Sequence, residues 1–201
     1  MPRCVVVVPT YNEAENLPAL AEKLLALEPP LDVLFVDDAS PDGTGDLADE
    51  LATRESRVRV LHRVGPRGYA RASVEGLDWA LAREYERVCT MDSDLSHDPE
   101  AIPELLDAVE RGADMAIGSR YVPGGELAVD WSPIRRAVSK MGSAYARAMI
   151  GAGTRDCTSG FRCYRADMLR ELNLDALHSE GYSFLIEVLS LLGRHGAHVV
   201  E

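Results

Sequence analysis

Short runs of hydrophobic residues alternate with longer stretches in which hydrophobic residues recur every three or four positions. The runs cover residues 4–8, 33–36, 58–61, 88–91 and 115–117. Unbroken hydrophobicity is typical of strands buried on both faces, which are usually parallel. The intervening stretches, at 17–27, 47–51, 74–81 and 102–109, have helical spacing. This alternation predicts an α/β fold: a doubly wound, mostly parallel sheet with flanking helices and with ligands at the carboxyl ends of the strands.

Polar residues follow the first two predicted strands, where the ligands of such a sheet bind. Residues 9–13 read Pro-Thr-Tyr-Asn-Glu, and residues 37–44 read Asp-Asp-Ala-Ser-Pro-Asp-Gly-Thr. Neither stretch is a GxGxxG or Walker loop, which argues against a dinucleotide or P-loop site. The carboxylates of the second stretch are suited either to binding ribose hydroxyls or to capping the following helix, and for Asp42 both interpretations stay open.

The composition narrows the class of protein. A chain of 201 residues, 46% of them hydrophobic, is expected to form one core and a single domain over residues 1–201. A formal net charge of −12 argues against nucleic acid as a partner, so any phosphate contact must be local. The four cysteines lack CxxC spacing and are interpreted as reduced structural thiols of a cytosolic protein. We recognise no signal peptide and no run long enough to span a bilayer, and expect a soluble or peripheral protein.

One segment, from Trp131 to Arg155, reverses the acidic character of the chain. Ser132-Pro133 can start a helix, on which Arg135 and Ser139 lie four residues apart on one face. The segment is interpreted either as a core-packed helix with a solvated basic side or as a helix at an anionic lipid surface, with cations that bind a phosphate headgroup. It has no acidic residue and five basic ones: Arg135, Arg136, Lys140, Arg147 and Arg155.

Two carboxylates follow the fourth predicted strand. Asp92 and Asp94 flank Ser93 directly after residues 88–91. Ionised carboxylates this close repel each other unless a cation joins them. Oxygen ligands favour Mg²⁺, Mn²⁺ or Ca²⁺, and Mg²⁺ typically binds one or two carboxylates together with substrate phosphates. The pair therefore predicts an open metal site at this strand end.

The neighbours of this pair allow simpler roles. His97 is interpreted either as a further ligand or as a turn residue behind the site. Asp98, which precedes Pro99, is predicted to be the N-cap of a helix over residues 101–111. Arg120 follows the fifth predicted strand and is expected at the same edge of the sheet. It is suited to neutralising a leaving diphosphate, or else it forms an ordinary surface salt bridge.

Six motifs together resemble a known family. In chain order they read PTYNEAENL (9–17), VDDASPDGT (36–44), MDSDLSHDP (91–99), GSRYVPGG (118–125), RRAVS (135–139) and DCTSGFRCYR (156–165). They look like those of the inverting family-2 glycosyltransferases of GT-A fold, and within that family most like the dolichol-phosphate or polyprenol-phosphate mannose synthases. The resemblance runs from Val5 to the end of the chain in the expected order.

The resemblance implies a nucleotide-sugar donor, GDP-mannose, a polyprenyl phosphate acceptor, and Mg²⁺ or Mn²⁺ as cofactor. It implies that residues of the first two motifs border the base and ribose, and these are Pro9, Tyr11, Glu13, Val36 and Asp38. It also implies that residues of the third motif face the metal and the diphosphate, and these are Asp92, Asp94 and Ser96, with Ser93 between them.

The same resemblance assigns the phosphates and the sugar pocket. Arg120 would bind donor phosphate, while Arg135 and Ser139 would hold the acceptor phosphate. Together with Asp94, these three would be the catalytic residues. Residues 158–162 would form a return strand beside the sugar pocket.

Several positions depart from the family pattern. Ser96 stands where many relatives have Gln, so water is expected to take part in its metal contact. Residues 66–70, Pro-Arg-Gly-Tyr-Ala, replace a Lys-x-Gly-Leu-Gly pattern, which leaves Arg67 as the nearby cation for the nucleotide. Leu185 occupies a position usually held by Gln. Relatives also continue into a basic DRxxGxSK-like segment, so either the chain is truncated or its remaining basic groups take that role.

The expected chemistry is one displacement at the anomeric carbon by an acceptor phosphate oxygen, with inversion of configuration. A phosphate monoester has a second pKa near 6, so it is largely dianionic at neutral pH and needs no strong general base. The protein is expected in the cytoplasm, peripheral to the cytoplasmic face of a membrane, with any anchoring partner unidentified. Two alternatives remain: a UDP-sugar donor such as UDP-glucose, and a nucleotide-sugar-binding module without turnover.

Overall fold

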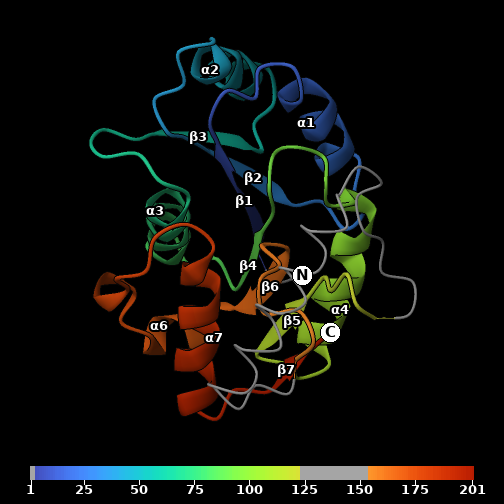
Figure 1. Cartoon of the computed structure of the whole chain (residues 1–201). Coiled ribbons are helices and arrows are strands. Elements are labelled where there is room, and N and C mark those ends of the chain that lie inside the picture. The colour runs from blue at the N-terminus through green and yellow to red at the C-terminus, as the bar shows by residue number, and fades with distance from the viewer. Residues whose placement is uncertain (1–2, 123–153) are drawn as a thin grey trace.

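The computed structural model describes residues 3–122 and 154–201 (Figure 1). Arg135, Ser139 and the rest of the basic segment up to residue 153 lie outside the described residues, so their predicted roles stay predictions. The described elements, in chain order, are β1 (Cys4–Thr10), α1 (Leu17–Leu25), β2 (Asp32–Asp37), α2 (Thr44–Arg54), β3 (Val58–His62), α3 (Tyr69–Leu81), β4 (Arg87–Thr90), η1 (Pro99–Ala101), α4 (Ile102–Glu110), β5 (Met115–Ile117), β6 (Arg162–Arg165), α6 (Ala166–Glu171), η2 (Leu174–Ala176), α7 (Ser183–Arg194) and β7 (Val199–Val200).

The strands form one sheet in the order β3-β2-β1-β4-β6-β5-β7. Pairing is parallel except on both sides of β6, which runs antiparallel between β4 and β5. The predicted mostly parallel sheet is therefore confirmed, and the five predicted runs are β1 to β5. The return strand expected at 158–162 is wrong in extent, because it begins only at Arg162. Thr158 and Ser159 instead use their side chains in loop hydrogen bonds, to Asp156 and to the Gly118 carbonyl oxygen.

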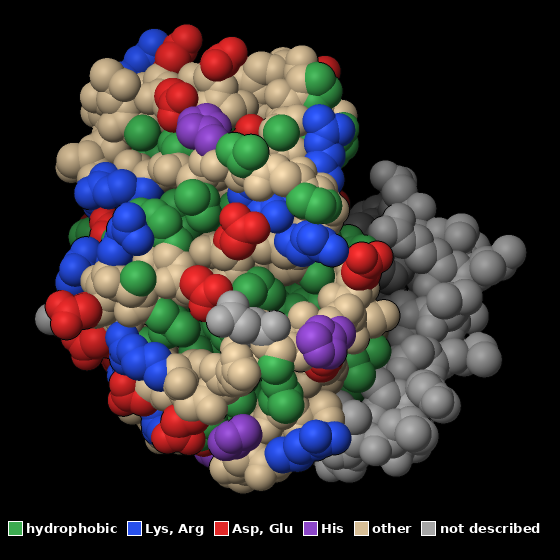
Figure 2. Space-filling model, turned by 90° about the vertical axis from the view of Figure 1, so that its left-hand side faces the viewer, with side chains coloured by type: hydrophobic (Ala, Val, Ile, Leu, Met, Phe, Trp, Pro, Cys, Tyr) green, Lys and Arg blue, Asp and Glu red, His purple; other side chains and the backbone are tan. Residues whose placement is uncertain are grey.

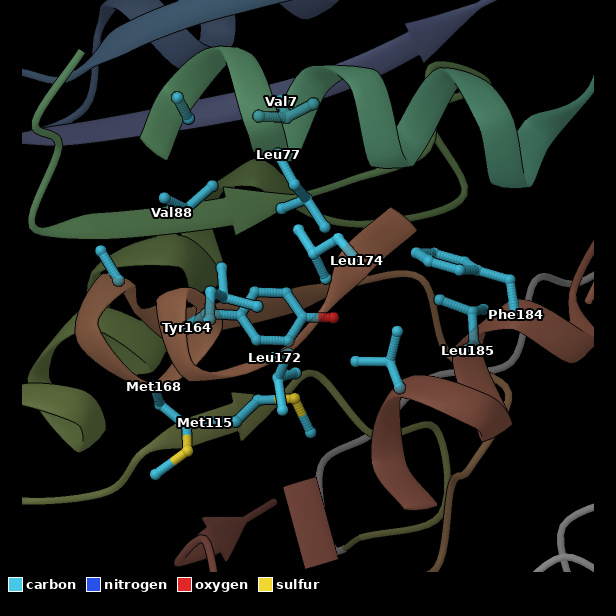
Figure 3. Close-up of a cluster of buried hydrophobic side chains, with 14 of the residues drawn as sticks. Val7, Leu77, Val88, Met115, Tyr164, Met168, Leu172, Leu174, Phe184 and Leu185 are labelled. Atoms are coloured by element: carbon cyan, nitrogen blue, oxygen red, sulfur yellow. The ribbon is translucent and has the colours of Figure 1, made fainter. Parts of the chain in front are cut away.

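Alternate residues of the strands are buried on opposite faces of the sheet. Val5 and Val7 pack with α3, α6 and α7 on one face, whereas Val6 and Val8 pack with α1, α2 and α4 on the other. Figure 3 shows the first of these clusters, in which Leu174 lies between Leu77 and Phe184. Because both faces are covered, the strands had to be hydrophobic throughout, which explains the unbroken runs in the sequence.

The sheet brings distant loops to one edge. β1, β2, β4 and β5 all point the same way, so the segments that follow them meet at their carboxyl ends. The start of β6 lies at this edge as well, because β6 is antiparallel to its neighbours. All four cysteines are free and buried, as expected for structural thiols. Within residues 3–122 and 154–201, no helix has the length and hydrophobicity to cross a membrane.

Candidate functional site

The loops after β1 and β2 are bound to each other at the carboxyl edge. The backbone N–H groups of residues 12–14 donate, in order, to the side chains of Ser40, Thr44 and Asp42, at 3.1, 2.9 and 3.2 Å. Asp42 also accepts from the Thr44 hydroxyl at 2.6 Å and from its N–H at 3.1 Å. The hydrogen bond from the Thr44 hydroxyl is the main cause of the lowered pKa of Asp42. Asp42 therefore binds the first residue of α2, but the N-cap of this helix is Gly43, so Asp42 is not the cap itself.

Asp38 is buried and is held by two hydrogen-bond donors. One carboxylate oxygen accepts from the guanidinium of Arg63, and the other accepts from the Gly68 N–H at 2.7 Å. Arg63 is itself buried and also donates to Glu75 at 2.7 Å. The loop between β3 and α3 is thereby attached to the end of β2, which gives Asp38 a single orientation.

Arg67 belongs to the same β3–α3 loop and lies against Tyr11. Its guanidinium carbon is 4.7 Å from the centre of the Tyr11 ring, and its Nη1 donates to the Tyr11 hydroxyl at 2.7 Å. Nη2 donates to the Ala39 carbonyl oxygen at 2.8 Å. This arrangement combines cation–π attraction with hydrogen bonds from the planar guanidinium. Arg67 therefore joins the loops after β1, β2 and β3.

A cleft of about 450 Å³ opens between these loops and the end of β4. Eight residues predicted to bind the nucleotide sugar line it: Pro9, Tyr11, Glu13, Asp38, Arg67, Asp92, Ser93 and Asp94. Three others do not. Val36 is fully buried in β2, while Ser96 and Arg120 lie outside the lining. The cleft therefore collects most of the predicted donor site.

Five further residues line the cleft but were not predicted as site residues: Thr10, Gly68, Tyr69, Ala72 and Tyr182. The rings of Tyr69 and Tyr182 lie 5.1 Å apart. Burial, followed by the charge of Asp92, raises the pKa of the Tyr69 hydroxyl well above its usual range, so this group is a neutral donor. A sequence signal existed for Tyr69, because it follows Arg67 closely in the stretch that departs from the family pattern.

A second cleft, of about 540 Å³, adjoins the first and shares Arg67, Gly68 and Tyr69 with it. It lies between the β3–α3 loop, α3 and residues 174–184, and the Asp92–Asp94 pair is not part of its lining. Figure 2 shows one flank of the molecule, where acidic and basic side chains are interspersed around hydrophobic hollows. That flank has no extended basic surface among the described residues, in keeping with the acidic composition.

His97 lies behind Asp92. Its Nδ1 accepts a hydrogen bond from the Asp92 N–H at 3.1 Å, and its ring stacks on Phe161 with the ring centres 5.2 Å apart. Burial lowers the pKa of His97, although the charges of Asp92 and Asp94 oppose this. The imidazole is therefore neutral with its proton on Nε2, which lies 3.9 Å from Asp92 Oδ2. These contacts support the interpretation of His97 as a residue behind the site.

The Asp92–Asp94 pair fits a divalent cation. Asp92 Oδ1 is buried and lacks a hydrogen-bond partner, which is costly for a carboxylate unless a cation or donor reaches it. Asp94 is exposed and accepts from the Ser96 N–H at 3.0 Å. The described residues contain no cluster of three or more His, Cys, Asp or Glu arranged around one ion. Two carboxylates with room for phosphate oxygens are what Mg²⁺ or Mn²⁺ accepts from a protein.

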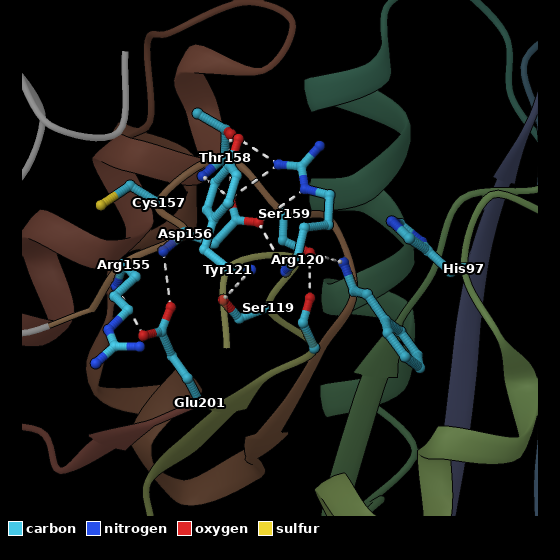
Figure 4. A network of polar contacts seen from close by, with 12 residues as sticks. His97, Ser119, Arg120, Tyr121, Arg155, Asp156, Cys157, Thr158, Ser159 and Glu201 are labelled. Atoms are coloured by element: carbon cyan, nitrogen blue, oxygen red, sulfur yellow. Dashed lines mark hydrogen bonds and ion pairs between the residues drawn. The ribbon is translucent and has the colours of Figure 1, made fainter. Parts of the chain in front are cut away.

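Arg120 lies at the predicted edge but is bound to Asp156 (Figure 4). Its Nε and Nη2 donate to the two carboxylate oxygens at 2.7 and 2.8 Å, and Nη2 also donates to Thr158 Oγ1 at 2.9 Å. The Asp156 side chain is 0% exposed, so this is no surface salt bridge. Burial would raise the pKa of Asp156, but the hydrogen bonds and charge of Arg120 outweigh it and lower the pKa.

The segment that carries Asp156 is fixed from the C-terminal side. The Glu201 carboxylate accepts from the N–H groups of Arg155 and Asp156, both at 2.7 Å (Figure 4). Earlier in the chain, Asp98 accepts from the Glu100 N–H at 3.0 Å and is the N-cap of η1. It therefore caps the short turn that leads into α4, and not α4 itself as predicted.

Comparison with known sequences gives a consistent result. The profile described as Glycosyl transferase family 2 matches residues 5–172. An undecaprenyl-phosphate mannosyltransferase of Micrococcus luteus is 47% identical over 199 residues, which cover 99% of this chain and 81% of that protein. A polyprenol monophosphomannose synthase of Mycolicibacterium smegmatis is 46% identical over 200 residues, covering 99% of this chain and 75% of that protein.

Solved structures agree on the fold. Glucosyl-3-phosphoglycerate synthase from Mycobacterium tuberculosis, crystallised with Mn²⁺, uridine diphosphate and phosphoglyceric acid, superimposes with a TM-score of 0.71 at 20% identity. The match covers 99% of this chain and 67% of that one. At this level of identity the likeness concerns the arrangement of the sheet and helices.

Proposed function

The chain belongs to glycosyl transferase family 2 and is a glycosyltransferase of GT-A fold, and from this premise we propose that it transfers mannose from GDP-mannose to a polyprenyl phosphate. The names of two relatives that share nearly half of its residues support the mannosyl group and the acceptor. The expected product is a β-linked polyprenyl phosphate mannose.

One observation carries the proposal. Asp92 and Asp94 line the same cleft as Tyr11, Asp38 and Arg67, and Asp92 Oδ1 is buried without a partner. A nucleotide-sugar diphosphate needs groups for its base and ribose at one end and charge neutralisation at the other. The cleft offers both within one volume, which suits such a donor better than a simple nucleotide-binding role does.

Asp92 and Asp94 would hold Mg²⁺ or Mn²⁺, with Ser96 contributing through water. Such an ion, when bound, neutralises charge that develops on the leaving diphosphate. The remaining tasks belong to side chains. Arg67 and Tyr11 would border the base, and Asp38 the ribose. Arg120 lies at the same edge of the sheet but outside the cleft lining, and Asp156 balances its charge, so it would assist the diphosphate only through its remaining field.

The proposed reaction is a single in-line displacement. An oxygen of the acceptor phosphate forms a bond to the anomeric carbon, while the bond from that carbon to the diphosphate oxygen breaks and GDP leaves. Because the acceptor is already dianionic, positioning and electrostatics carry the rate. Arg135 and Ser139 would align the acceptor phosphate. Because that acceptor is a membrane lipid, we place the protein in peripheral contact with the cytoplasmic face of a membrane.

A transfer assay tests the proposal. The protein is incubated with GDP-mannose or UDP-glucose and a short polyprenyl phosphate, with Mn²⁺, with Mg²⁺, or with a chelator. We expect mannosyl lipid only with GDP-mannose and a divalent cation. Preferential transfer from UDP-glucose would show that the donor is a UDP-sugar and not GDP-mannose. Donor binding without any lipid product would show that the protein binds nucleotide sugars without turnover.

A further inference from the structure

Tyr69 is a half-buried residue of the cleft to which the expected donor site gives no role. It is the first residue of α3, and its ring packs against Tyr182. The Tyr69 phenol places a hydroxyl in the wall of the cleft.

The position of that hydroxyl follows from Gly160. A methyl group on Gly160 would lie 2.4 Å from Tyr69 Oη and 2.9 Å from Asp92 Oδ1. Both oxygens therefore border one small space that only a glycine leaves open. Asp92 Oδ1 is the buried oxygen without a hydrogen-bond partner, and Tyr69 brings a rotatable O–H donor to its vicinity.

The floor of this space is fixed. Thr90 Oγ1 donates to the Gly160 carbonyl oxygen at 2.7 Å. Arg162 is fully buried and donates to the carbonyl oxygens of Ser159 and Cys157, at 2.8 and 3.0 Å. The same guanidinium reaches the Leu185 carbonyl oxygen of α7 at 3.0 Å. The loop that holds Gly160 near the two oxygens is thus hydrogen-bonded to β4 through Thr90 and to β6 through Arg162, which in turn binds α7.

We propose that Tyr69 is a positioning residue that acts through Asp92, its hydroxyl directing the carboxylate toward a divalent cation. Tyr69 lies on the Oδ1 side, and His97 Nε2 lies 3.9 Å from Oδ2 on the other. A carboxylate oxygen has lone pairs for both a hydrogen bond and a metal ion, and groups behind a metal ligand tune its affinity. This role rests on the proposed metal-dependent transfer.

The test compares Tyr69→Phe, which removes only the hydroxyl, with Tyr85→Phe. Tyr85 is a matched control because it is buried and donates to Asp32 at 2.6 Å, yet it does not line the cleft. Binding of Mn²⁺ is measured in the presence of GDP by electron paramagnetic resonance of free Mn²⁺. GDP binding without metal and the thermal midpoint of the metal-free proteins are measured in parallel.

We expect the Kd of Tyr69→Phe for Mn²⁺ to rise about 10-fold. GDP binding without metal and the thermal midpoint should stay as in wild type, and Tyr85→Phe should bind Mn²⁺ normally. Equal Mn²⁺ affinity of wild type and Tyr69→Phe would overturn the role of Tyr69 alone. If wild type itself bound no Mn²⁺ with GDP, the metal site of the proposed function would fall, and the role of Tyr69 with it.

Discussion

The guanidinium of Arg67 stacks on the ring of Tyr11 at 4.7 Å and donates to its hydroxyl at 2.7 Å. Replacing Arg67 with Ala removes both contacts and opens one wall of the cleft. Cation–π contacts at such sites contribute about 0.5–2 kcal/mol, so we expect KM for the nucleotide sugar to rise about 10-fold with kcat little changed.

Steady-state kinetics with varied donor check this expectation. Arg71→Ala is the matched control, because Arg71 is half exposed, pairs with Glu180 at 3.7 Å and does not line the donor cleft. A fall in kcat with unchanged KM would contradict a role for Arg67 in binding the nucleotide.

Asp94→Ala should abolish metal-dependent transfer while leaving the fold intact. Asp94 is exposed and carries no core packing, so the losses are one cation ligand and the exposed hydrogen bond from the Ser96 N–H. We expect a loss of about 100-fold or more in kcat/KM, since even groups behind a ligand cost about 10–100-fold. Asp98→Ala, in the same loop, should lose about 1 kcal/mol of stability through its cap and keep its turnover. Near-normal transfer by Asp94→Ala would remove the metal assignment.

Asp156→Asn should destabilise the protein in a pH-dependent way. The exchange removes the buried carboxylate that pairs with Arg120, which costs about 3–5 kcal/mol at neutral pH. Arg120 lowers the pKa of Asp156 below its ordinary 3.8 in the folded state. The stability that comes from this carboxylate is therefore fully present above pH 3.8 and is lost as the pH falls through the lowered folded pKa.

Urea unfolding of wild type and Asp156→Asn, followed from about pH 2 to about pH 7, measures how the free energy of unfolding depends on pH. The difference in the free energy of unfolding should shrink in the acid range. Asp107→Asn is the comparison, because its pair with Arg111 at 2.6 Å is exposed and contributes at most about 1 kcal/mol. A difference that stays constant with pH would rule out ionised Asp156 as the source.

Gly160→Ala should damage the corner around Asp92. The added methyl group meets Tyr69 Oη and Asp92 Oδ1 below 3.0 Å, while Thr90 holds the Gly160 carbonyl oxygen in place. We expect a loss of about 1–3 kcal/mol in thermal or urea unfolding, together with weaker Mn²⁺ binding. Gly193→Ala, in α7 with open space around it, should instead gain about 0.5–1 kcal/mol. Normal stability and normal metal binding of Gly160→Ala would show that Tyr69 and Asp92 can move aside for the added methyl group, which contradicts the prediction.

The double change of Arg135 and Arg136 to Ala tests the acceptor assignment, which rests on the sequence because both residues lie outside the described ranges. KM for a short polyprenyl phosphate should rise about 10-fold or more, since loss of a charged hydrogen bond costs about 1.5–3 kcal/mol. The Kd for GDP, measured by calorimetry, should stay unchanged. Equal losses for lipid phosphate and nucleotide would contradict the assignment.

Much of the fold was predictable because it follows from local patterns. Strands buried on both faces need unbroken hydrophobic runs, and parallel strands place the segments after them at one edge. This is why Asp38 and Asp92 were expected together and lie in one cleft. The start of β6 was not predictable, because Thr158 and Ser159 suit a strand but are used by the loop through their hydroxyls.

The unexpected part of the site depends on contacts between distant segments. Tyr69 reads as an ordinary helix residue until Gly160 is brought beneath its hydroxyl. Arg120 was expected from its motif, but its pairing with buried Asp156 depends on how residues 154–161 return to the sheet. Single motifs identify which groups carry chemistry, whereas the groups that orient them are decided by tertiary packing.

The antiparallel position of β6 has a consequence for the order of folding. β1, β2 and β3 can pair through contacts between segments that are neighbours in the chain, and the loops that follow them already hold the nucleotide wall with Asp38 and Arg67. The cation corner needs Gly160 against Thr90, a contact that closes a loop of about 70 residues and forms slowly because of its entropy cost. A folding chain would thus acquire a surface for the base before it acquires a place for the diphosphate.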